Sequence, residues 1–240
     1  DVCSSDLTVQ LLLKTSKYER YEIDRRFHAL AHLHNVCVKH ARKCMIRLQH
    51  DKRYAELRQL YNELVKKEKM SKEEKSQKKK LAKQLAACRT EQGLSKASLE
   101  HYLKVCGKQF SKLLSSQQVQ AEADRVWCGV ERCLFGNGKE LHFKKLMDFD
   151  TIGGKSNKNG ARFDLDAMYV NWLGLSLKCY LPKSENSLSY VWESLKGKIS
   201  YCNIKRLMFS SGWRYYAEIV VSGAAPTRVS IGTSTMGIDP

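Results

Sequence analysis

The chain has 240 residues, and 42 Lys and Arg stand against 25 Asp and Glu, so its formal net charge is +17 before any histidine is protonated. A charge of this size attracts phosphate and releases its counterions on binding, which makes nucleic acid the first partner to consider. No run of about 18 apolar residues is present and the start lacks a signal-peptide layout, which argues against a membrane partner and against secretion. We therefore expect a cytoplasmic protein.

The first half of the chain predicts one strand followed by helices. Leu7 to Lys14 is a short, leucine-rich and β-branched run that suits a strand paired with a distant segment. Asp24 is the predicted cap of a helix, and further apolar stripes at helical spacing continue to about residue 134. Ser71 and Glu74 have the spacing of a capping box. Residues 24–134 are thus predicted to form an all-α bundle of four or five helices.

From Gly136 onward the pattern changes to strands separated by glycine-rich turns. The clearest pair is 199–209 with 213–221, because the intervening Ser-Ser-Gly fits a short hairpin loop that needs a left-handed glycine. In the second arm, Trp213, Tyr215 and every second residue after them are predicted to form a buried face. The residues between them form a second face of mixed character. Since the helical block lies between an early strand and this region, the architecture expected is α+β, a discontinuous β-barrel with a helical insertion.

Cysteine usage favours reduced, mostly buried thiols. The nine cysteines are scattered, and no two are separated by two residues as in a zinc knuckle; they occupy positions 3, 37, 44, 88, 106, 128, 133, 179 and 202. A disulfide framework is therefore not expected.

Two groups of cations are candidates for binding nucleic acid. The lysine-rich run from Lys66 to Lys83 predicts a positive helical rod, for which an electrostatic role and a merely solvated surface both stay open. The second group combines cations, glycine-rich loops and aromatic rings, a mixture suited to an irregular RNA. Its members are Lys144, Lys145, Lys155, Lys158, Arg162, Lys205, Arg206, Trp213 and Arg214. For Trp213 taken alone, core packing is the competing interpretation.

A self-contained active site is not predicted. His28 and His32 have the i, i+4 spacing of a metal pair, but no carboxylate accompanies them, which favours a structural role. Asp239 follows a small apolar strand pattern, where metal-dependent nucleases of the RNase H-like class carry their first acid. Cleavage by two metal ions needs a cluster of carboxylates, and one aspartate is not sufficient.

Several ordered segments together resemble those leading into the RuvC-like nuclease domain of the TnpB family and of compact type V CRISPR effectors. The segments are Phe135-Gly136-Asn137-Gly138-Lys139, Phe143-Lys144-Lys145, Gly154-Lys155-Ser156-Asn157, Tyr201-Cys202-Asn203-Ile204-Lys205-Arg206, Trp213 to Val221, Pro226 and Gly237-Ile238-Asp239-Pro240. The likeness covers roughly the last 110 residues, whereas the helical block agrees in position and character alone.

This resemblance implies a domain organisation and a set of partners. Residues 1–23 and 135–234 would form a wedge domain, 24–134 an inserted helical recognition domain, and 235–240 the start of a RuvC-like strand. In that family these parts hold a structured guide RNA and clasp its duplex with target DNA, so that base pairing reads the sequence. The cell would be bacterial or archaeal.

The resemblance also implies an activity for a longer parent protein. Asp239 matches the first catalytic acid and Mg²⁺ ligand of a Mg²⁺-dependent RNA-guided DNA endonuclease, whose other acids and zinc ribbon would follow residue 240. We therefore expect the chain to be an inactive N-terminal fragment, in which no metal site is complete. The alternative is a non-catalytic RNA- or DNA-binding protein with a similar basic barrel. A coiled structural assembly is a third interpretation, disfavoured because the apolar stripes are short and interrupted.

Overall fold

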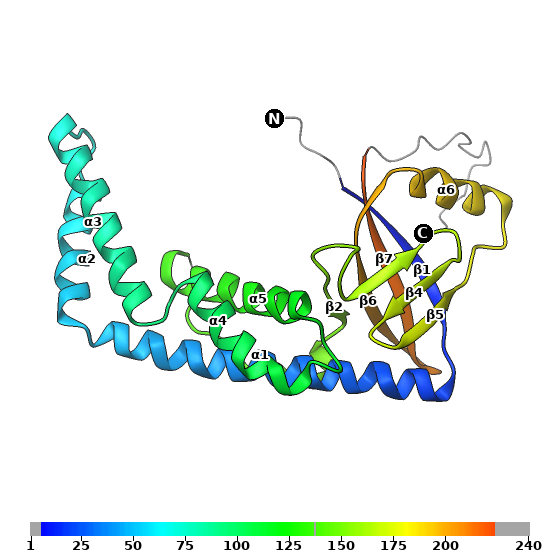
Figure 1. The fold of residues 1–240 in the computed structure, drawn as a ribbon. Coiled ribbons are helices and arrows are strands. Elements are labelled where there is room, and N and C mark those ends of the chain that lie inside the picture. The colour runs from blue at the N-terminus through cyan, green and yellow to red at the C-terminus, as the bar shows by residue number, and fades with distance from the viewer. Residues whose placement is uncertain (1–5, 137, 224–240) are drawn as a thin grey trace, which may run out of the picture. The chain divides into compact units, whose positions relative to one another are not determined.

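The computed structural model describes residues 6–136 and 138–223, which form two compact units (Figure 1). Residues 6–19 and 154–223 make up one, which we call the sheet unit. Residues 20–153 make up the other, which we call the helical unit. The chain is therefore of the α+β class, as the sequence predicts.

The sheet unit is antiparallel throughout and joins segments far apart in the sequence. Its strands are β1 (Asp6–Lys14), β3 (Ala161–Asp164), β4 (Tyr169–Trp172), β5 (Leu175–Cys179), β6 (Lys198–Phe209) and β7 (Gly212–Ser222). They are arranged in the order β6-β7-β1-β5-β4-β3, so β1 lies between two strands from much later in the chain. The early strand and its distant pairing are confirmed.

Side-chain alternation decides which face of this sheet is buried. The buried positions of β1 are Val9, Leu11 and Leu13, and those of β7 include Tyr215, Ala217, Ile219 and Val221. Every second residue of a strand points to the same face, so these side chains form one apolar layer. Burying each large aliphatic side chain stabilises the fold by about 1.5–3 kcal/mol. The opposite face is mixed, because it carries polar and aromatic side chains together with apolar ones such as Leu12 and the buried Val220.

The long hairpin of β6 and β7 agrees with its prediction. Phe209 pairs with Gly212 at its tip, and Gly212 has a φ of 101°, a value that favours glycine because a Cβ would strain the backbone. A register shift between Ile199 and Tyr201 marks a bulge near the start of β6.

The sheet is open in the described residues. Strand pairing stops at β3, and among residues 6–136 and 138–223 no ladder joins β3 to β6. Some Cα atoms of β3 and β6 nevertheless lie within 8 Å, so the sheet is strongly curled. Closure into a barrel stays a prediction.

We did not predict α6 (Glu185–Leu195), which is capped by Ser184 and buries Val191 and Leu195.

The helical unit contains most of α1 (Lys17–Gln49) and the helices that follow it. These are α2 (Lys52–Val65), α3 (Lys72–Glu91), α4 (Lys96–Gly107), the short η1 (Lys108–Phe110), α5 (Ser116–Phe135) and η2 (Leu146–Asp148), with the two-residue β2 (Thr151–Ile152) at the end. The helices α2 and α3 pack on each other, and so do α4 and α5. The predicted all-α character of residues 24–134 is confirmed.

The predicted start of α1 at Asp24 is wrong. Ser16 and Glu19 form reciprocal bonds, in which the Ser16 N–H donates to Glu19 Oε2 at 2.7 Å and the Glu19 N–H donates to Ser16 Oγ at 3.2 Å. This capping arrangement starts the helix two turns earlier. The capping box of Ser71 and Glu74 at the start of α3 is confirmed.

Cysteines in the described residues are all free thiols. Five of them are buried, at positions 37, 44, 88, 179 and 202, while Cys128 is exposed. This agrees with the prediction of reduced, mostly buried thiols. Across residues 6–136 and 138–223, we find no helix with the length and apolarity needed to cross a membrane.

Candidate nucleic-acid interface

The tip of the β6–β7 hairpin brings two guanidinium groups onto two aromatic rings. Arg206 Cζ lies 4.4 Å from the ring centroid of Trp213, and Arg214 Cζ lies 4.5 Å from that of Phe209. Such stacking holds the planar cation over the ring face. We call Arg206, Phe209, Trp213 and Arg214 the tip cluster.

The two pairs of the tip cluster differ in their access to a ligand. Arg206 lies on the inner face of the sheet, 2% exposed, and Trp213 is half-buried. Phe209 and Arg214 are both exposed and lie on the outer face. The pair best placed to stack on an unpaired base is therefore Phe209 with Arg214, whereas Arg206 acts mainly as a packing partner of Trp213. We did not predict Phe209.

Lys205 neighbours this cluster but has a partner of its own. Its Nζ donates to Glu218 Oε1 at 2.9 Å, and both side chains are partly buried. The carboxylate neutralises much of the lysine charge, so Lys205 offers less to a phosphate than the sequence suggests.

Hydrogen bonds to β6 fix the glycine-rich loop that precedes β3. The Gly154 N–H donates to Asn203 Oδ1 at 2.9 Å, and the Asn157 N–H donates to the Ser200 carbonyl at 2.9 Å. A Cβ on residue 154 would lie 2.8 Å from the Cys202 carbonyl oxygen, so glycine is needed for this close approach of two main chains.

The Asn157 side chain closes the other end of the loop. Its amide exchanges two hydrogen bonds with the main chain of Phe163, at 2.8 and 2.9 Å. Lys155, Lys158 and Arg162 are exposed on this segment, and we call them the loop cluster. Because the loop is bonded to residues 200–203 of β6, the loop cluster lies beside the strand that leads to the tip cluster.

The outer face of the sheet adds cations that we did not predict. Lys14 of β1 lies directly opposite Lys178 of β5, and Lys178 also lies opposite Tyr169 of β4. Both lysines are exposed. Like charges at paired positions destabilise a sheet, so their presence there makes the face more suitable for an anion.

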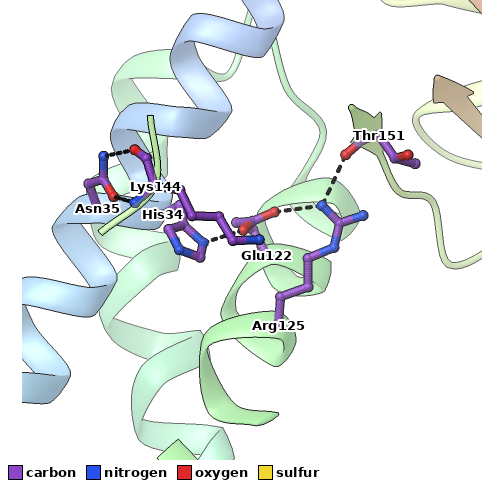
Figure 2. A network of polar contacts seen from close by, with 6 residues as sticks. All are labelled: His34, Asn35, Glu122, Arg125, Lys144 and Thr151. Atoms are coloured by element: carbon purple, nitrogen blue, oxygen red, sulfur yellow. Dashed lines mark hydrogen bonds and ion pairs between the residues drawn. The ribbon is translucent and has the colours of Figure 1, made fainter. Parts of the chain in front are cut away.

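Lys144 and Lys145 belong to the helical unit, where Asn35 of α1 holds the segment that carries them (Figure 2). The Asn35 amide donates to the Lys144 carbonyl at 2.9 Å, and the Lys144 N–H donates to Asn35 Oδ1 at 3.0 Å. The Lys145 N–H donates to Asp148 Oδ2 at 2.8 Å. Both lysine side chains are exposed. These two lysines belong to a different unit from the tip and loop clusters, which lie in the sheet unit.

A network centred on the buried carboxylate of Glu122 supports the same segment (Figure 2). His34 Nδ1 lies 2.6 Å from Glu122 Oε1, and Arg125 Nη1 donates to Glu122 Oε2 at 3.1 Å and to the Thr151 carbonyl at 2.9 Å. Glu122 is 1% exposed, and these contacts give both of its carboxylate oxygens a protein partner in place of water. The network ties α1 and α5 to the residues just after Lys144 and Lys145.

No metal site accompanies these cations in the described part of the chain. Residues 6–136 and 138–223 contain no group of three His, Cys, Asp or Glu side chains able to hold an ion. His32 packs its ring against Phe110, with 5.6 Å between centroids, in keeping with a structural role. Asp239, the predicted catalytic acid and metal ligand, lies outside the described residues.

Comparisons with known proteins give no identification. No protein-family model matches the chain. No curated protein sequence matches it significantly either.

Proposed function

We propose that the chain is the nucleic-acid-binding portion of an RNA-guided DNA endonuclease of the TnpB type. Its sheet unit would then act as the wedge domain that holds a structured guide RNA, with the curled sheet as the greater part of the barrel. The helical unit would act as the recognition domain that contacts the guide and its target DNA. Residues 235–240, which the resemblance assigns to the start of a RuvC-like domain, lie outside the described residues.

The observation that carries this proposal is the placement of the loop cluster beside β6. The bonds from Gly154 and Asn157 to β6 bring a glycine-rich cationic loop next to the strand that ends in exposed Phe209 and Arg214. Main-chain amides and lysines suit phosphates, while an arginine stacked on a ring suits an unpaired base. Folded RNA presents both kinds of group close together.

Catalysis is the part of the proposal that the described residues do not supply. Residues 6–136 and 138–223 contain no cluster of three or more His, Cys, Asp or Glu side chains that could hold Mg²⁺, and Asp239 would need further acids from a longer parent protein. Mg²⁺ would supply the activation of water and the stabilisation of the leaving oxygen in the complete enzyme. We therefore expect the 240-residue chain to bind RNA without cutting DNA.

The test is a binding assay against RNA transcribed from the transposon end that adjoins the parent gene. An unrelated structured RNA of equal length and similar helix content is the matched competitor. We expect the transposon-end RNA to bind more tightly, with an affinity that falls steeply as salt rises from about 50 to 300 mM. Equal affinity for both RNAs would contradict the guide-RNA assignment and favour a non-catalytic, general nucleic-acid binder.

A second observation separates these two functions independently of binding. Under the endonuclease proposal, the parent gene read past the codon for Pro240 encodes a Glu as the second catalytic acid, an Asp as the third, and paired cysteines for a zinc ribbon. A reading frame without these residues would leave a basic RNA- or DNA-binding protein as the better description.

A further inference from the structure

The helices α2 and α3 form an arm that packs chiefly on itself (Figure 1). Tyr54 and Leu64 of α2 and Leu81, Leu85 and Cys88 of α3 are its buried residues. Leu81, Leu85 and Cys88 follow one another at spacings of four and three, so they line one side of α3. The opposite side of α3 has no such packing role.

Four exposed lysines lie on that opposite side. They are Lys72, Lys75, Lys79 and Lys83, and we call them the lysine stripe. Their spacing of three, four and four places all four within an arc of about 80° and along about 16 Å of helix. Neighbouring stripe positions are about 5–6 Å apart at Cβ, so the four ammonium groups form one continuous row.

The charge of the lysine stripe is not compensated within α3. The helix positions three and four residues from each stripe lysine hold only Lys, Ser or Ala. Glu74 lies in the first turn of α3, but its carboxylate accepts hydrogen bonds from the Ser71 N–H and from Lys67 Nζ. In the described part of the chain, no ion pair joins a stripe lysine to an acid.

Uncompensated rows of this kind oppose folding. Like charges three or four residues apart destabilise a helix, and the lysine stripe contains three such pairs in succession. A surface that only needed to be solvated would be more stable with glutamates interspersed among the lysines. Binding of an extended anion would neutralise the row and remove the repulsion between its lysines.

The side chains around the stripe indicate which anion. Ser76, Ala82 and Ala86 flank the lysines, and the stripe side carries no large apolar residue that could enter a lipid surface. It also carries no aromatic ring that could stack on an unpaired base. What remains is a regular row of phosphates, as along the backbone of a double helix.

We propose that the lysine stripe of α3 binds the phosphate backbone of a nucleic-acid duplex without reading its sequence. This surface lies in the helical unit and uses none of the residues of the tip or loop clusters. The proposal rests on the recognition role proposed above for the helical unit, and it names the residues and the ligand chemistry of that role. Its test uses paired duplexes and not the transposon-end RNA, so its failure can be told apart from failure of the guide-RNA assignment of the sheet unit.

The test compares two variants of the full 240-residue chain. The stripe variant replaces Lys72, Lys75, Lys79 and Lys83 by Gln, which keeps nearly the same helix propensity. The control variant makes the same change at four other exposed lysines of the helical unit, Lys104, Lys108, Lys112 and Lys139. Both variants lose the same charge, and far-UV circular dichroism confirms that each keeps its helices.

The probe is a blunt, fully paired duplex of about 24 base pairs, titrated at several salt concentrations. Duplexes of two unrelated sequences are expected to bind the wild-type chain equally. We expect the stripe variant to lose affinity at least about tenfold at 0.1 M salt, with a salt slope shallower by about 3 to 4. The control variant should retain most of the wild-type affinity and most of the wild-type salt slope.

Three results would overturn the proposal. The first is an unchanged salt slope in the stripe variant, and the second is an equal loss in both variants, which would mean that only total charge matters. The third is stripe-dependent binding to vesicles containing phosphatidylserine without any to the duplex, which would make a membrane surface the partner instead.

Discussion

Replacing Glu122 by alanine should destabilise the helical unit more than the loss of any exposed acid. The carboxylate is 1% exposed, lies 2.6 Å from His34 Nδ1 and accepts from Arg125 at 3.1 Å. Removing one partner of a buried charged pair costs about 3–5 kcal/mol, because the other partner is left buried without compensation. Since the Arg125 side chain is 38% exposed and can be rehydrated, we expect the lower end, about 3 kcal/mol.

Two further variants sharpen this prediction. Glu122→Gln keeps the shape and one acceptor oxygen, so its expected cost is smaller, about 1–2 kcal/mol. Glu91→Ala removes an acid of the same unit whose ion pair with Arg53 is exposed on both sides, and its expected cost is about 0–1 kcal/mol.

Urea unfolding followed by far-UV circular dichroism measures these differences, because most of the helices belong to the helical unit. The denaturant slope should stay unchanged while the midpoint shifts. If Glu122→Ala lowered the free energy of unfolding no more than Glu91→Ala does, the network around Glu122 would have no stabilising role.

Three other variants or measurements test separate parts of the structure. Gly154→Ala should cost about 1–3 kcal/mol, because its Cβ would lie 2.8 Å from the Cys202 carbonyl oxygen; an unchanged urea midpoint would contradict this close approach. Burial raises the pKa of the Cys37 thiol to about 12, so iodoacetamide and peptide mapping should find Cys128 modified in the native protein and Cys37 only after unfolding. Desolvation and two nearby cations lower the pKa of His40, so the unfolded chain binds a proton there that the folded chain does not. Its stability contribution should be present above about pH 6.5 and be lost as the pH falls below that value, and His40→Phe should weaken this pH dependence.

Local patterns in the sequence are sufficient to predict several elements. Alternation of apolar residues with a mixed set after Trp213, together with Ser-Ser-Gly, predicts the β6–β7 hairpin, and Gly212 has the left-handed backbone expected of it. The spacing of Ser71 and Glu74 likewise predicts the start of α3. In each case the interactions that decide the structure lie within a few residues of one another.

Other boundaries cannot be read from apolar periodicity. The helix α1 begins at Lys17, but its apolar stripe begins near Ile23. Tyr18 and Tyr21 in its first turns are exposed, so apolar periodicity does not mark the true start. The short α6 is missed for a related reason, since only Val191, Ser194 and Leu195 are buried along it.

The candidate site shows the same division between local and distant information. Exposure of the loop cluster follows from its glycine-rich context, which the sequence displays. The bond between Lys205 and Glu218 depends on the register of β6 against β7, and the pairing of Lys14 with Lys178 depends on β1 entering a sheet of much later strands. Pairing of strands distant in sequence fixes these neighbours, and no periodicity encodes it.

A matched pair of double variants decides whether the hairpin tip of the sheet unit is part of an RNA-binding surface. Phe209→Ala with Arg214→Ala removes the exposed stacked pair of the tip cluster. Phe135→Ala with Arg89→Ala removes a similar stacked pair in the helical unit, where Arg89 Cζ lies 4.8 Å from the Phe135 ring centroid. Both changes delete the same two residue types.

Affinity for the transposon-end RNA is the quantity to compare. Loss of one base-stacking platform costs about 1–3 kcal/mol, so the tip variant should bind roughly tenfold more weakly or worse, while the helical-unit variant stays near the wild-type value. Equal affinities for the two variants would contradict the claim that the tip of the β6–β7 hairpin contacts RNA.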